Sequence, residues 1–178
     1  MFVALDLPPV ARTALAEWRD ELIEGRRDLR PVAAEALHVT LVFLGWQDES
    51  AAEAIFEAAE GAAGGMHSPV LRPVGVRALP PRDPRLFALD LEDEHGRAVE
   101  LQGTVSGALE RWYRPEKRPF WPHVTLARVK RGERRVAALP GAPAPPGDAL
   151  RASMLTLYRS ILRPQGAVYD PLARMELG

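Results

Sequence analysis

The tetrapeptide His-Val-Thr-Leu occurs twice in this chain, at residues 38–41 and again at 123–126. The chain has 178 residues and only four histidines, so half of its histidines lie inside one repeated string. With average residue frequencies, a coincidental repeat of this kind has a probability of about one in a thousand. The repeat therefore indicates a duplicated core strand or a duplicated functional site.

The alternation inside the repeat separates these two explanations. On a β-strand, side chains at positions i and i+2 share a face. His38 and Thr40 would therefore point one way, as would His123 and Thr125, while the valines and leucines point the other way and pack. The same parity places Phe43 on the packing face, in the core. A core strand explains only the apolar face, so we interpret the repeated imidazole and hydroxyl as a site.

Apolar periodicity predicts seven strands and three helices. The second helix would begin at an N-cap Ser50 and end at Gly61, and Pro171 implies that the last strand lies at a sheet edge. The expected strands cover 2–7, 36–45, 69–79, 85–93, 121–130, 153–162 and 166–177, and the expected helices cover 10–25, 51–61 and 96–113.

A strand, a helix and an HVTL strand follow one another at 2–41 and again at 86–126. We therefore expect an α+β fold of two related lobes, with mainly antiparallel sheet, helices outside and a central cleft that carries the two HVTL strands. The whole chain, 1–178, would form one bilobal domain, with a Pro/Gly/Ala-rich loop at about 132–149.

Composition sets further limits. Hydrophobic residues make up 47% of the chain, which is enough for a core without staples. The absence of cysteine excludes disulfides and thiolate metal sites and fits a reducing compartment. No signal peptide or membrane span is recognisable, so we expect a cytoplasmic protein. The net charge of −1 does not by itself indicate nucleic-acid binding, and we attribute the predominance of arginine over lysine mainly to genome composition.

Two imidazoles can accept one proton and donate another near neutral pH. Two threonine hydroxyls can hold the non-bridging oxygens of a phosphate. This set of groups describes the opening of a phosphodiester with no metal and no cofactor. The His-x-Thr pairs lack a nearby third metal ligand in the sequence, so a two-histidine metal site is the weaker alternative.

Four strings of the sequence carry a family resemblance: "FVALDLP", "LHVTLVFLG", "RPFWPHVTLAR" and "LTLYRSILRPQGAVYDPLARMEL". With two His-x-Thr-x motifs, the chain resembles the two-histidine phosphoesterase superfamily. Within it, the chain is most similar to the RNA 2′,3′-cyclic phosphodiesterases, also called 2′–5′ RNA ligases. The resemblance implies a bilobal α+β fold whose motif strands line a cleft.

The resemblance also implies residue roles. His38 would be the proton donor and His123 the proton acceptor, while Thr40 and Thr125 would bind the phosphate. Arg128 would help to hold the phosphate charge. The substrate would be RNA with a 2′,3′-cyclic phosphate end, or a small cyclic nucleotide, and the product a 2′-phosphomonoester.

Residues around the second motif are less clear. Arg128 follows His123 by an odd number of residues, so a regular strand would place it on the opposite face, and it would need a bulge to reach the site. Phe120 or Trp121 could stack on a nucleobase, although packing in the core or at the rim is the simpler explanation. The other two histidines, at 67 and 95, are expected in exposed loops.

Three functions remain open at this point. Hydrolysis of the cyclic phosphate comes first, because water at its bulk concentration outcompetes an RNA end. The reverse reaction, 2′–5′ ligation of RNA ends, is the second. A non-catalytic RNA-binding module on the same fold is the third, and the presence of all four motif residues speaks against it. We expect a monomer that does not associate with membranes.

Overall fold

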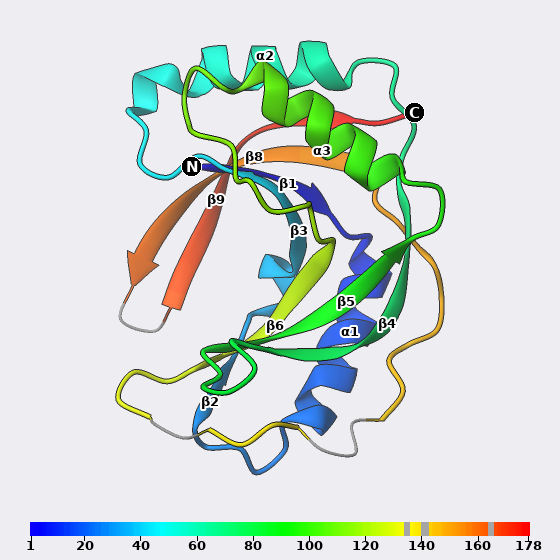
Figure 1. Cartoon of the computed structure of the whole chain (residues 1–178), viewed down its shortest axis with the longest axis vertical. Coiled ribbons are helices and arrows are strands. Elements are labelled where there is room, and N and C mark those ends of the chain that lie inside the picture. The colour runs from blue at the N-terminus through cyan, green and yellow to red at the C-terminus, as the bar shows by residue number, and fades with distance from the viewer. Residues whose placement is uncertain (134–135, 140–142, 164–165) are drawn as a thin grey trace.

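The computed structural model describes residues 1–133, 136–139, 143–163 and 166–178, and in this part of the chain it is an α+β structure (Figure 1). Nine strands form one antiparallel sheet in the order β7-β4-β5-β6-β3-β1-β8-β9, and β2 pairs with β6. The strands are β1 (Phe2–Asp6), β2 (Leu29–Pro31), β3 (His38–Phe43), β4 (Val70–Leu79), β5 (Leu86–Asp93), β6 (His123–Val129), β7 (Leu150–Arg151), β8 (Met154–Arg163) and β9 (Gly166–Glu176).

The seven predicted strands are all present, with small differences at their ends. The sequence analysis missed β2 and β7, because strands of three and two residues are too short to show an alternation. Strand β9 lies at the edge of the sheet, as Pro171 predicted, because an edge strand tolerates a residue without an N–H group.

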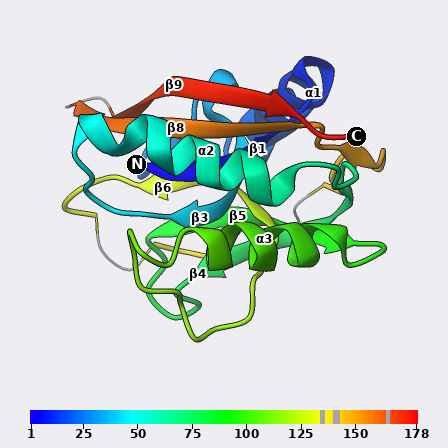
Figure 2. The ribbon, with the colours of Figure 1, turned by 90° about the horizontal axis from the view of Figure 1, so that it is seen from above.

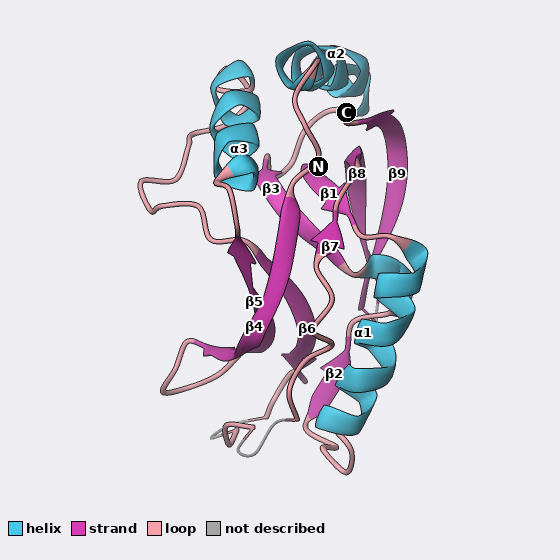
Figure 3. Ribbon diagram, turned by 90° about the vertical axis from the view of Figure 1, so that its right-hand side faces the viewer, coloured by secondary structure: helices cyan, strands magenta, loops and turns pink. Residues whose placement is uncertain are grey.

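Three α-helices are described: α1 (Pro9–Leu22), α2 (Ala52–Ala63) and α3 (Arg97–Ala108). Helix α1 has its proline in the first turn, where the missing N–H group costs nothing. Figure 3 shows α2 and α3 together at one end of the sheet and α1 beside β2 at the other. None of the described helices combines the length and the apolar character that crossing a bilayer requires.

The predicted helix limits need correction. Asp48, not Ser50, provides the cap before α2, because its carboxylate accepts the Ser50 N–H at 2.9 Å and opens a short 3₁₀ turn, η2 (Glu49–Ala51). Helix α2 continues past Gly61 to Ala63, since one glycine inside a helix costs only about 1 kcal/mol relative to alanine. Helix α3 ends at Ala108, earlier than expected.

The two faces of the sheet differ. One face packs against the three helices and holds the principal core, which includes Val39, Leu41 and Val124 together with Leu15, Ile55 and Leu101 of the helices. The opposite face carries a smaller aromatic cluster of Phe2, Tyr158 and the partly buried Tyr169. Because one face is covered by helices, polar side chains on the central strands can reach solvent only from the other face.

The middle of the sheet relates the two halves of the chain. Counted outward from the central β6–β3 pair, β5, β4 and β7 on one side take the same positions in the sheet as β1, β8 and β9 on the other. Figure 2 shows the β8–β9 hairpin and β4 on opposite sides of the molecule, with β3 and β6 between them. This arrangement confirms the expected α+β fold of antiparallel sheet with helices outside.

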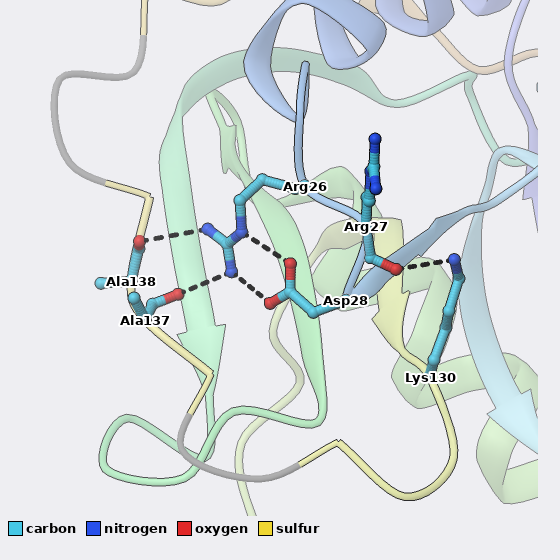
Figure 4. A network of polar contacts seen from close by, with 6 residues as sticks. All are labelled: Arg26, Arg27, Asp28, Lys130, Ala137 and Ala138. Carbon is cyan, nitrogen blue, oxygen red and sulfur yellow. Dashed lines mark hydrogen bonds and ion pairs between the residues drawn. The ribbon is translucent and has the colours of Figure 1, made fainter.

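The loop predicted at 132–149 has neither helix nor strand in its described residues, and 134–135 and 140–142 lie outside them. It is nevertheless attached to the first part of the chain. Arg26 donates to the carbonyl of Ala137 at 3.0 Å and forms an ion pair with Asp28, as Figure 4 shows. The Trp18 indole N–H donates to the carbonyl of Pro143 at 3.2 Å. The loop therefore follows the end of α1.

Candidate active site

The two HVTL motifs lie side by side at the centre of the sheet. Val39 of β3 and Val124 of β6 are direct partners in the antiparallel pair, and both side chains are completely buried against the helices. His38, Thr40, His123 and Thr125 alternate with these buried residues and are only partly buried. The four polar side chains therefore lie on the face that the helices leave open, as the strand parity predicted.

A backbone carbonyl fixes the ring of His38. Its Nδ1 lies 2.8 Å from the carbonyl oxygen of Ala36, which can only accept, so Nδ1 carries a proton. Its Nε2 lies 3.0 Å from the Thr40 hydroxyl, which donates to it when the imidazole is neutral. The ring also stacks on Phe2 at 4.9 Å and meets Tyr169 edge-on at 5.2 Å between ring centroids.

His123 is held in the same manner. Its Nδ1 lies 2.8 Å from the carbonyl oxygen of Trp121, and its ring stacks on the Trp121 indole at 4.1 Å. The Arg77 guanidinium lies 4.8 Å from the centroid of this indole. Among the described residues, no group hydrogen-bonds to Nε2 of His123. That nitrogen therefore has a lone pair available for a proton.

Burial makes both imidazoles less basic than in water. The pKa of His38 is lowered to about 4, mainly by burial and to a smaller extent by the charges on His123 and Arg128, against the raising effects of the Ala36 carbonyl and Asp6. Burial likewise lowers the pKa of His123, against the Trp121 carbonyl and Asp90. Both rings are therefore neutral at pH 7 before a substrate binds.

A carboxylate lies across from each histidine. Asp6 of β1 is the register partner of His38, and Asp90 of β5 is the register partner of His123. Burial and a hydrogen bond to Asp6 raise the pKa of Tyr158 to about 12, so this phenol stays protonated and donates to Asp6 at 2.7 Å. The negative charge of Asp6 raises the pKa of His38, and that of Asp90 raises the pKa of His123.

Asp90 has a different set of partners. Arg77 donates to its Oδ2 through Nε at 3.0 Å and through Nη2 at 2.7 Å. Its Oδ1 is buried and has no hydrogen-bond partner among the described residues. The sequence analysis missed both aspartates, although a signal exists: Ala-Leu-Asp-Leu occurs at 4–7 and again at 88–91.

Arg128 shares the face of His123, and the structure supplies the bulge that strand parity required. Phe87 of β5 pairs with Ala127 and Ala88 with Thr125, so β6 contains one extra residue between these pairs. Leu126 and Ala127 consequently both face the core and are fully buried. Arg128 is thereby returned to the polar face, where its charge lowers the pKa of both motif histidines.

A second bulge, in β3, shows that the prediction for Phe43 was wrong. Val3 pairs with Val42 and Ala4 with Thr40, so β3 has its extra residue at Leu41. Leu41 and Val42 are both buried, and Phe43 is turned out of the core with 66% of its surface exposed. A periodicity of two cannot anticipate a bulge, which is why the parity argument failed here.

The remaining candidates are two aromatic residues before the second motif and the two histidines outside the motifs. Phe120 is partly buried and packs against the principal core, which agrees with the simpler of the two explanations for it. Trp121 stacks on the second motif histidine, His123, as Phe2 stacks on the first. His67 and His95 are exposed, as expected. Across the described ranges, no three His, Asp or Glu side chains are grouped so as to hold a metal ion.

The family model described as the 2′-5′ RNA ligase superfamily matches residues 7–160. The chain belongs to this superfamily. A relative from Aeropyrum pernix, named RNA 2′,3′-cyclic phosphodiesterase, is 32% identical over 163 residues, which are 89% of this chain and 92% of the relative. A Thermus thermophilus relative with the same name is 28% identical and covers 99% of this chain and 89% of its own length.

Solved structures of superfamily members agree. The crystal structure of a Thermus thermophilus protein superposes with a TM-score of 0.81 at 28% identity, covering 99% of this chain and 96% of that chain. Escherichia coli LigT, crystallised with NADP⁺, superposes with a TM-score of 0.78 at 26% identity and the same coverage. The family and fold expected from the two motifs are therefore confirmed.

Proposed function

We propose that this protein hydrolyses the 2′,3′-cyclic phosphate ends of RNA to 2′-phosphomonoesters by metal-independent acid–base catalysis. The observation that carries the proposal is the paired arrangement of His38 and His123 on neighbouring strands, each with Nδ1–H bound to a backbone carbonyl. This leaves Nε2 of each ring to exchange a proton. Relatives from three organisms bear the name RNA 2′,3′-cyclic phosphodiesterase, which supports the choice of substrate.

In the proposed reaction, water attacks phosphorus while Nε2 of His123 takes its proton. The bond between phosphorus and the 3′ oxygen breaks, and His38 delivers a proton to that oxygen. The product has a 2′-phosphomonoester and a 3′-hydroxyl. In-line displacement places the entering and leaving oxygens on opposite sides of phosphorus, so two separate histidines suit it better than one. The available lone pair on His123 supports its assignment as base.

The role of His38 as acid requires a change on binding. With a pKa of about 4, this imidazole is neutral in the free protein at pH 7. The negative phosphate would favour the protonated ring and raise its pKa. His38 Nε2 would then exchange the Thr40 hydroxyl for the leaving oxygen, and Thr40 would be released to hold a phosphate oxygen.

The anion itself needs positive and polar groups around it. Thr40 and Thr125 would donate hydrogen bonds to the non-bridging oxygens. Arg128 would contribute a charge-assisted hydrogen bond, typically about 1.5–3 kcal/mol. Its charge lowers the pKa of both motif histidines, which supports a role at the same phosphate. Stacking of a base on Phe120 stays an untested expectation, and the exposed Phe43 is an alternative surface for it.

The test is incubation with an oligoribonucleotide that ends in a 2′,3′-cyclic phosphate, in excess chelator, followed by separation of 2′- and 3′-phosphate products. We expect a 2′-phosphate, and turnover slowed on the order of 10²–10⁴-fold in His38→Ala or His123→Ala. A 3′-phosphate would reverse the assigned polarity. Activity that disappears in chelator and returns with one divalent ion would establish a metal-dependent enzyme instead.

The two alternatives give different outcomes in the same assay. Addition of an RNA with a 5′-hydroxyl would give a 2′–5′ joined product if ligation were the main reaction. Binding of the oligonucleotide without any turnover would indicate an RNA-binding module.

The proposal extends to the state of the protein. Residues 1–178 would act as one bilobal domain, as a monomer and in the cytoplasm. The continuous sheet that joins both halves supports one domain, and the lack of cysteine fits a reducing compartment. Sedimentation equilibrium and cell fractionation test these points.

A further inference from the structure

A cavity of about 240 Å³ lies next to the motif histidines. Its charged lining residues are all arginines, namely Arg30, Arg128 and Arg163. The rest of its lining comes mainly from the segment after β2 and from the β8–β9 hairpin, including Tyr169. The cavity therefore lies where the two halves of the chain approach each other.

The backbone brings these arginines together. Arg30 of β2 and Arg128 of β6 are register partners, so their side chains share one face. Arg163 pairs with Gly166 where β8 joins β9. Gly166 has a φ of +139°, and an added Cβ would come within 3.4 Å of the Arg30 guanidinium carbon. The Arg30 side chain therefore lies against the hairpin at Gly166.

The charge of this cluster is not balanced internally. Eight other arginines have a carboxylate partner among the described residues, such as Arg26 with Asp28 and Arg77 with Asp90. No ion pair or hydrogen bond joins the three cavity arginines to a carboxylate in the described part of the chain. Like charges held together repel, so a cluster of this kind favours an anion from outside. The planar guanidinium suits phosphate oxygens in particular.

The cavity is also close to the reacting groups. Its lining residue Tyr169 meets the His38 ring at 5.2 Å, and the carbonyl of its lining residue Ala36 accepts a hydrogen bond from His38 Nδ1–H. Arg128 belongs both to the cavity and to the surroundings of the histidines. A second phosphate in the cavity would thus be a near neighbour of a cyclic phosphate between the histidines.

We propose that this cavity binds the phosphodiester that joins the terminal nucleoside to the one before it, through Arg30 and Arg163. The inference rests on the proposed function and names its substrate class: an RNA chain rather than a mononucleotide. Phosphate contacts carry no sequence information. The site would therefore favour substrates in which the RNA chain continues beyond the terminal nucleoside, and it would not distinguish one base from another.

Three probes isolate the second phosphate. The first is a dinucleoside phosphate with a 2′,3′-cyclic end, the second is the same compound with an uncharged methylphosphonate linkage, and the third is a nucleoside 2′,3′-cyclic phosphate. We expect kcat/KM for the natural linkage to exceed that for the methylphosphonate by about tenfold or more, the effect of a charge-assisted hydrogen bond. The excess should shrink as salt concentration rises.

Variants assign the effect to residues. Arg30→Gln and Arg163→Gln should each reduce the natural-to-methylphosphonate ratio toward one. Arg151→Gln is the matched control, because Arg151 is exposed on β7, near the other edge of the sheet. Arg30→Lys serves as a second variant that keeps the charge, and it should retain more of the ratio than Arg30→Gln. Thermal unfolding midpoints report whether each variant is folded.

The outcomes are distinct. A ratio near one in the unmodified protein, or a ratio that survives both glutamine substitutions, would overturn the second phosphate site. In either case, turnover of the nucleoside cyclic phosphate would leave the proposed function standing. No turnover of any probe would overturn the function itself, together with the site that rests on it.

Discussion

Arg128 and Phe43 occupy equivalent positions in the two halves of the protein. Each follows its motif histidine by five residues, and each is turned to the histidine face by one extra residue in its strand. The bulges thus place a cation at one end of the site and an exposed aromatic ring at the other. Only the cation can stabilise a phosphate, so the two halves are related in backbone but not in chemistry.

Arg128→Gln should therefore lower kcat/KM for a cyclic phosphate by roughly 10–150-fold, the effect of losing one charge-assisted hydrogen bond. The thermal midpoint should hardly change, because Arg128 is exposed. Arg151→Gln provides a charge-matched control. Unchanged activity in a folded Arg128→Gln protein would show that the guanidinium does not contact the phosphate.

The threonines can be tested with their shape preserved. Thr40→Val and Thr125→Val remove the hydroxyl and keep the branched side chain that suits a strand. We expect each to lower kcat/KM by roughly 10–150-fold, since each loses a hydrogen bond to a charged oxygen. Steady-state kinetics and circular dichroism measure the loss and the fold. A folded valine variant with full activity would make that threonine structural.

The two histidines should behave as one unit. Removal of either imidazole should slow turnover by on the order of 10²–10⁴-fold, because general acid and general base each contribute about that much. The double variant His38→Ala/His123→Ala should be little slower than the slower single variant. Multiplication of the two single effects would instead mean that the histidines act in independent steps.

The pH dependence of kcat/KM follows from the lowered pKa values of the free protein. The productive form has His123 neutral and His38 protonated. Because the pKa of His38 is about 4 and that of His123 is below 6.5, the profile should be bell-shaped with both limbs below about 6.5. A bound phosphate would favour the protonated rings and raise both pKa values, so the limbs of kcat should lie at higher pH. An optimum of kcat/KM above pH 7 would contradict these assignments.

Asp90→Asn tests the carboxylate across from His123. Its negative charge raises the pKa of that imidazole, so its removal should lower the pKa further. The His123 resonance should then titrate at a lower pH in NMR spectra. Asp170→Asn, which removes a carboxylate paired with the distant Arg159, should leave that titration in place. An unshifted His123 in the Asp90→Asn protein would mean that Asp90 only orients Arg77 and Trp121.

The sequence by itself determined the family, the α+β class and the face on which His38, Thr40, His123 and Thr125 lie. These follow from patterns within single segments of the sequence, namely the alternation of polar and apolar residues on each motif strand and the repeat of the motif. It also contained the signal for Asp6 and Asp90 in its second repeated tetrapeptide, Ala-Leu-Asp-Leu.

Only the tertiary structure decided what depends on pairing between distant strands. The bulges that bring Arg128 to the site and turn Phe43 out of the core exist because β6 and β3 each carry one residue more than their partners at that point. The arginine cavity likewise needs β2 against β6 and the β8–β9 hairpin beside Arg30. Register is a relation between two segments, so no periodicity within one segment can reveal it.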